Sequence, residues 1–131
     1  MTPFYQFTID TVRDDLLPLM TKIVHDAPGA AAEFSLTYDY IYDKIGQWLK
    51  QQPKHFDLKK MLPRQIHSQP PEEALLSYMM NLAVLACANG DSLVRTDLRR
   101  KIDALVIAGN KKDLSEAKTA RYVIANRSIG R

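Results

Sequence analysis

A few side chains in this sequence have types and spacings that could support catalysis. Asp39 and Asp43 stand four residues apart, which places both carboxylates on one face of a helix, and paired carboxylates can perform general acid–base chemistry. Di-metal sites in helical bundles combine glutamates with a Glu-x-x-His motif, and the sequence contains no such motif. We therefore interpret Asp39 and Asp43 as part of an ordinary helix surface.

Three histidines and one cysteine are the other candidates for chemistry. His25, His55 and His67 have no metal-ligating neighbour at helical spacing, so we predict no metal site. Cys87 lies in an apolar run near the end of a helix, where nothing lowers the pKa of a thiol, and we expect a core residue. No glycine-rich phosphate loop is present. We predict a protein without cofactors that is not an enzyme.

Basic residues are concentrated in the last part of the chain. Residues 1–94 hold 8 Lys and Arg against 11 Asp and Glu, whereas residues 95–131 hold 10 against 4. Cationic side chains on a common face can bind phosphates by releasing counterions. The predicted basic face consists of Arg95, Arg99, Arg100, Lys101, Lys111, Lys112, Lys118 and Arg121.

Two other interpretations of these basic residues stay open. Asp97 stands four residues before Lys101, and such pairs are common on the solvated face of an ordinary helix. A basic surface also speeds encounter with an acidic protein partner. We expect an acidic protein partner, with sequence-nonspecific binding of DNA or RNA as the alternative, because no base-reading motif accompanies the charges.

Composition limits the class of protein. The chain of 131 residues is 46% hydrophobic and 25% charged, which is typical of one globular domain with its own core. A single cysteine excludes an intramolecular disulfide framework. The N-terminus lacks the pattern of a signal peptide, and the longest apolar run is far too short to span a membrane. We expect a cytoplasmic protein that does not bind membranes and that can form homo-oligomers.

The elements that would position these residues are helical. Apolar residues recur every three or four positions from Ile9 to Ala27 and from Phe34 to Leu49, which predicts two amphipathic helices. Pro18 interrupts the first pattern, so we expect a kink there or a new start near Leu17. The stretch 53–71 contains several prolines and is expected to be a long connection with one short turn of helix capped by Asp57.

The third helix is expected at the centre of the fold. It begins at Pro70-Pro71-Glu72-Glu73, which are strong start signals, and stops at Asn89-Gly90. Almost every residue between is apolar, and a helix that is apolar on all sides is buried on most of them. A fourth helix begins at Asp91-Ser92, either of which can cap it, and is expected to end at Gly109, with a fifth starting at Asp113.

These elements predict an all-α protein, a compact bundle of four to five helices around the apolar segment 71–89. We expect a single domain over residues 1–131, with a frayed tail at 126–131. Gly46 lies inside the second helix and suggests a close helix crossing, with a partner contact as the alternative. The aromatic stripe of that helix is best explained as core, with Tyr38, Tyr42 and Trp48 as the alternative protein-contact residues. The protein would then be an adaptor, an inhibitor or immunity-type factor, or a small subunit of a larger assembly.

Overall fold

The structure is a computed structural model that describes residues 2–120, with side chains described as far as residue 109. All regular structure in this part of the chain is helical. In chain order the elements are α1 (Phe4–Thr11), the π-helical turn η1 (Val12–Leu16), α2 (Leu17–Val24), α3 (Ala30–Lys50), the 3₁₀ turns η2 (Leu58–Met61) and η3 (Arg64–Ile66), α4 (Pro71–Ala88) and α5 (Ser92–Ala120).

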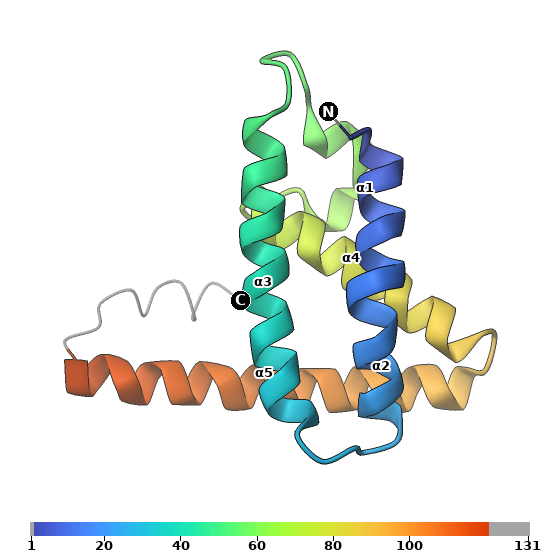
Figure 1. Cartoon of the computed structure of the whole chain (residues 1–131), viewed down its shortest axis with the longest axis vertical. Coiled ribbons are helices and arrows are strands. Elements are labelled where there is room, and N and C mark those ends of the chain that lie inside the picture. Colours follow the sequence, from blue (N-terminus) through green and yellow to red (C-terminus); the bar gives the residue numbers. More distant parts are fainter. Residues whose placement is uncertain (1, 121–131) are drawn as a thin grey trace.

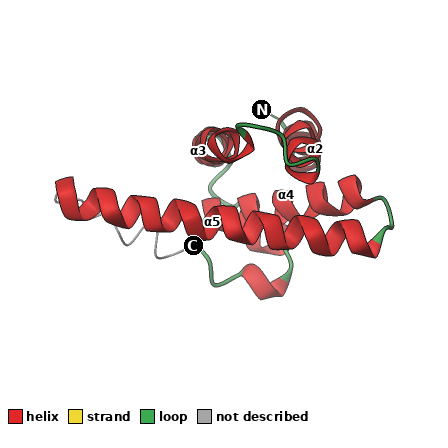
Figure 2. Cartoon of the chain, turned by 90° about the horizontal axis from the view of Figure 1, so that it is seen from below, coloured by secondary structure: helices red, strands yellow, loops and turns green. Residues whose placement is uncertain are grey.

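The helices form two layers. The continuous rod α1–η1–α2 lies beside α3, and the two run in opposite directions (Figure 1). Helices α4 and α5 form the second layer and cross beneath this pair, which Figure 2 shows with α2 and α3 seen end-on. Helix α4 packs against η1, α2, α3 and α5, so it is the central helix that the sequence predicted. The all-α bundle is thereby confirmed.

The core is formed mainly by α4 and by the inner faces of α1–η1–α2 and α3. Leu75, Met79 and Ala83 of α4 are completely buried, as are Met20 and Ile41 from the other layer. These side chains repeat at helical spacing, which explains why each amphipathic pattern in the sequence forms a helix.

Pro18 does not break the first helix. A proline ring clashes with the carbonyl four residues earlier and cannot donate a backbone hydrogen bond. The chain accommodates it by a wider turn, η1, in which Leu17 N–H donates to Val12 O, five residues back. Helix α2 then starts at Leu17, where the sequence predicted a new start. The stripe predicted for this helix is wrong at Ile9, which is 55% exposed.

Two aspartates cap helices as predicted. The Asp57 carboxylate accepts from Lys59 N–H at 3.1 Å and starts η2 within the connection 53–71. The Asp91 carboxylate accepts from Leu93 N–H and Val94 N–H at 2.9 and 3.2 Å and starts α5. Both satisfy backbone donors that a helix start leaves without an intrahelical partner.

The predicted break between a fourth and a fifth helix is wrong. Helix α5 runs without interruption from Ser92 to Ala120, through Gly109 and Asp113. An isolated glycine costs a helix only about 1 kcal/mol relative to alanine and does not end it by itself. The C-terminal part of α5 projects past α3 (Figure 1). The predicted tail 126–131 lies outside the described residues.

Candidate functional site

The described basic residues of α5 point to different sides of the helix. Arg95, Arg99 and Arg100 are exposed, and Lys101 is half-buried. The Arg99 guanidinium donates to the Asn81 side chain of α4, whereas the Lys101 ammonium contacts α2. Arg100 pairs with Asp97 at 2.7 Å. Lys111, Lys112 and Lys118 belong to the part of α5 whose side chains are not described, and Arg121 lies outside the described residues. The common face predicted for all eight stays a prediction.

Lys101 ties α5 to the end of α2. Its ammonium donates to Val24 O at 3.2 Å and pairs with Asp97 at 2.9 Å and Asp26 at 3.1 Å. A cation at a helix C-terminus also compensates the helix dipole. Hydrogen bonds to Asp97 and then Asp26 raise the pKa of Lys101, and the bonds from Lys101 and Arg100 lower the pKa of Asp97. Lys101 therefore has a structural role.

Lys101→Met is expected to lower the midpoint of thermal unfolding clearly more than Arg100→Met does. Methionine keeps the apolar stem but leaves Val24 O without its donor. The Asp97 pKa is lowered in the folded state, so its pairing stabilises the fold at neutral pH and is lost as the pH falls through that pKa. The difference between Lys101→Met and the wild type should therefore shrink in acid. Equal midpoints at neutral pH for Lys101→Met and Arg100→Met would contradict this role.

The aromatic residues predicted as protein contacts belong mostly to the core. Trp48 is 4% exposed and stacks on Phe7 with ring centroids 4.7 Å apart. Its Nε1–H donates to Thr2 O at 2.8 Å. Tyr38 and Tyr42 are half-buried and pack against the core. The core interpretation that the sequence favoured therefore applies to Trp48, which offers no surface for a partner.

Helices α1 and α4 each carry apolar side chains that are exposed (Tyr5, Ile9 and Leu85) or half-buried (Tyr78 and Leu82). Tyr5 and Ile9 stand one turn apart on α1, and Tyr78, Leu82 and Leu85 follow one another at helical spacing on α4. The Phe4 ring links the two helices, with centroids 5.6 Å from Tyr5 and 6.3 Å from Tyr78. We call these five residues, Tyr5, Ile9, Tyr78, Leu82 and Leu85, the α1–α4 apolar surface.

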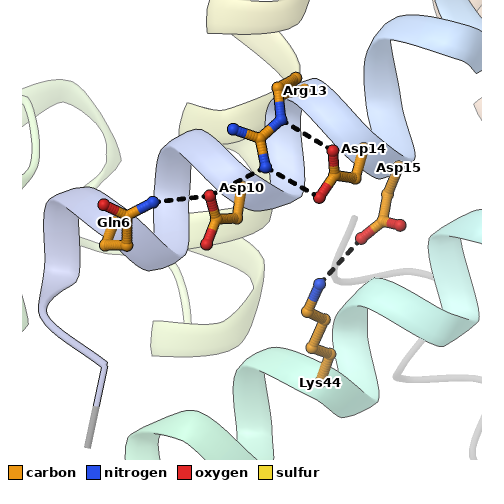
Figure 3. A network of polar contacts seen from close by, with 6 residues as sticks. All are labelled: Gln6, Asp10, Arg13, Asp14, Asp15 and Lys44. Atoms are coloured by element: carbon orange, nitrogen blue, oxygen red, sulfur yellow. Dashed lines mark hydrogen bonds and ion pairs between the residues drawn. The ribbon is translucent and has the colours of Figure 1, made fainter.

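Polar groups border the α1–α4 apolar surface on two sides. On α1, Gln6, Asp10, Arg13 and Asp14 form a hydrogen-bonded network (Figure 3). The hydrogen bond from Arg13 holds the pKa of Asp14 below its ordinary value. On the α5 side, Asn81 accepts from Arg99, which places a guanidinium beside the exposed face of α4.

A contact between α3 and η1 holds the first layer together. Figure 3 shows Lys44 of α3 donating to Asp15 of η1 at 2.9 Å.

The connection 53–71 borders an open pocket of about 860 Å³ against the end of α3 and the start of α4. We call it the connection pocket. Its apolar wall consists of Leu49, Phe56, Leu58, Leu62, Ile66 and Ala74. His67 lines it too, and its Nε2 lies 2.9 Å from Leu62 O. This volume is in the range of pockets that hold small molecules.

Gly46 lines the connection pocket, and the close helix crossing predicted for it is wrong. A Cβ built at Gly46 would meet no atom within 4 Å outside its own helix turn. Packing therefore gives no reason for a residue that destabilises a helix interior.

Gly46→Ala is accordingly expected to raise the free energy of unfolding by up to about 1 kcal/mol, because alanine reduces the freedom of the unfolded chain and meets no clash. Chemical denaturation of both proteins measures the difference. A destabilised variant would mean that the backbone at Gly46 has a requirement other than space.

A second cleft of about 380 Å³ lies where α3, α4 and α5 meet. Its lining includes the buried carboxylate of Glu73 together with Tyr38, Arg99 and Asp103. Ser77 Oγ donates to Gln69 Oε1 at 3.3 Å in the same wall. The cleft thus combines charges of both signs in a partly enclosed space.

The remaining candidates for chemistry lie apart. Asp39 and Asp43 are exposed on the outer side of α3. Burial raises the pKa of the half-buried Cys87 thiol, which disfavours the nucleophilic thiolate. Among the described residues, no three His, Cys, Asp or Glu side chains are grouped so that they could hold a metal ion. No described helix is both long and apolar enough to cross a membrane.

Sequence reasoning did not find the α1–α4 apolar surface or the connection pocket. The apolarity of α4 on nearly all sides was a signal for the first. The glycine inside α3 was a signal for the second. Comparisons of the chain with protein-family models, with curated proteins and with solved structures found no match.

Proposed function

We propose that this chain is a non-enzymatic binding protein that acts by contact with another protein, as an adaptor, an inhibitor or immunity-type factor, or a small subunit of a larger assembly. The observation that carries the proposal is the α1–α4 apolar surface. Helix α4 is apolar on nearly all sides, yet its Leu85 is 52% exposed, and Ile9 of α1 is 55% exposed. Exposed apolar side chains with polar groups at their border are typical of protein interaction sites.

The border of this surface suggests the chemistry of the partner. Arg99 lies at the α5 edge through its bond to Asn81, and Arg95 stands one turn before it on the same side of α5. An amphipathic helix that lays its apolar face on Tyr78 and Leu85 would bring its flanking residues toward these guanidinium groups. Acidic residues at those positions would be attracted and would speed association. The expected partner is therefore an acidic amphipathic segment of another protein.

Selection of peptides displayed on phage against the whole chain tests this proposal. We expect enriched peptides with apolar residues at helical spacing and acidic residues beside them. Their binding should be lost in Leu85→Lys and in Ile9→Lys, both of which alter exposed positions and should leave the fold intact. Leu36→Lys is the matched control, because Leu36 is 72% exposed on the outer face of α3. Peptides that bind Leu85→Lys and the wild type equally would overturn the proposal.

The nucleic-acid alternative gives a different result in a parallel experiment. Binding of fluorescent double-stranded DNA should fall steeply with salt if α5 contacts phosphates. It should survive Leu85→Lys and be lost when Arg95 and Arg99 are both replaced by glutamate. Since Arg100 and Lys101 already pair with Asp97, and Lys101 also with Asp26, they contribute less available charge than the sequence suggests.

A further inference from the structure

We infer that the connection pocket is a binding site for a small, uncharged, largely apolar molecule with an aromatic ring. This site is separate from the α1–α4 apolar surface and does not depend on the proposed function. It lies where the end of α3, the connection 53–71 and the start of α4 line an open pocket of about 860 Å³.

The shape of the pocket is the first argument. Ligand pockets in proteins are concave spaces of about 300–1,000 Å³ with mostly apolar walls and a few polar groups. The connection pocket has this composition, with Leu49, Phe56 and Leu62 in the apolar wall and Ser68 and Gln69 among the polar groups. The prolines at 53, 70 and 71 also line it and fix the backbone of its wall.

Gly46 is the second, independent argument. It stands inside a helix of 21 residues, where alanine would be more stable, and no neighbouring atom requires a bare backbone. Because it has no side chain, Gly46 leaves space at the wall of the connection pocket. A larger side chain at this position would extend into that space.

The charges of the lining indicate the class of ligand. Two cations, Lys50 and Lys59, are balanced by two carboxylates, Asp57 and Glu72. The Asp57 carboxylate is already engaged by Lys59 N–H as a helix cap. The pocket therefore has no net charge that would favour an ion. Phe56 offers an aromatic ring, and aromatic pairs are favourable beyond the area they bury.

The chain contains its own reporter for this pocket. Trp48 is the only tryptophan, and its ring lies 5.5 Å from the ring of Phe56 in the pocket wall. The test uses prodan, a neutral naphthalene dye whose absorption overlaps tryptophan emission. We expect energy transfer from Trp48 that saturates with a Kd of about 1–100 µM, the range for a ligand of this size.

Three variants locate the bound dye. Gly46→Leu should weaken binding by about tenfold or more, whereas Gly46→Ala should retain most of it. Leu85→Lys should bind as the wild type does, because Leu85 lies on the α1–α4 apolar surface. Methyl NMR of the wild-type chain gives the same information without a substitution. Added prodan should shift the methyl signals of Leu62 and Ile66 and leave those of Leu98 and Ile102 in place.

The outcomes separate the two sites. Failure of the dye to bind up to its solubility limit would overturn the inference, and so would unchanged methyl signals of Leu62 and Ile66 at saturating dye. Binding that is lost in Leu85→Lys and kept in Gly46→Leu would place the dye on the α1–α4 apolar surface and also overturn it. The proposed function would survive all three results, because its test depends on acidic peptides and on Leu85 and Ile9.

Discussion

Replacing Leu75 by alanine is expected to lower the free energy of unfolding by about 2–5 kcal/mol. Leu75 lies on the central helix α4 and is completely buried, so the substitution removes buried methyl groups and leaves a cavity. The cost depends on how far neighbours can collapse into the space. Because α4 packs against η1, α2, α3 and α5, the surroundings of its buried residues are held by several helices at once, and we expect a value in the upper part of this range. Urea denaturation followed by circular dichroism measures the loss.

Leu85→Ala is the matched control for this prediction. The same chemical change is made ten residues further along α4, at a residue that is 52% exposed. We expect a loss below about 1 kcal/mol, since surface substitutions leave little cavity. Equal losses at Leu75 and Leu85 would mean that the exposed face of α4 is covered, for example by a second copy of the chain. A measurement of stability against protein concentration would then identify that copy.

This contrast also shows what could be predicted about α4 from the sequence. Its start at Pro71, its end at Asn89 and its central place follow from local signals and from its apolarity. Local signals do not show which side of such an apolar helix remains uncovered, because Leu75 and Leu85 are the same residue type with similar neighbours in the sequence. The uncovered side is decided by the directions in which α1–η1–α2 and α5 cross α4, and these directions depend on tertiary packing.

Tertiary packing also decided features of the other elements that local sequence signals could not predict. Ile9 continues an apolar period that extends to Ile23, yet the wider turn η1 changes the phase of the helix and turns Ile9 outward. Gly109 and Asp113 are both common at helix ends, but neither forces an end as proline would, and α5 continues through them. Caps such as Asp57 and Asp91 were predictable because the interaction is local and needs only adjacent backbone.

The candidate site was less predictable than the fold. The sequence offered the charges of α5, and the structure shows that Lys101 serves the junction with α2 while Arg99 borders the α1–α4 apolar surface. The same amino-acid type thus has two roles that no local pattern distinguishes. The connection pocket is assembled from three segments, of which the proline-rich connection has no periodicity from which its walls could be read.

Trp48→Ala is expected to cost about 3–5 kcal/mol of unfolding free energy, the range for truncation of a large buried aromatic residue. Trp48 joins three parts of the chain, since it stacks on Phe7 of α1, meets Phe56 of the connection edge-on and donates to Thr2 O. Its loss would therefore loosen both the start of α1 and the wall of the connection pocket. Circular dichroism is the suitable probe, because the variant lacks the only tryptophan.

Trp48→Phe separates the ring contacts from the hydrogen bond. Phenylalanine can keep the stacking on Phe7 but cannot donate to Thr2 O, so much of the loss should be that of one hydrogen bond, about 0.5–1.5 kcal/mol. Hydrogen exchange should then show faster opening of the first turn of α1, with α4 still protected. If Trp48→Ala cost no more than Trp48→Phe, the rings around Trp48 would not be packed as a unit. The aromatic stripe of α3 would then again be available as a contact surface for a partner.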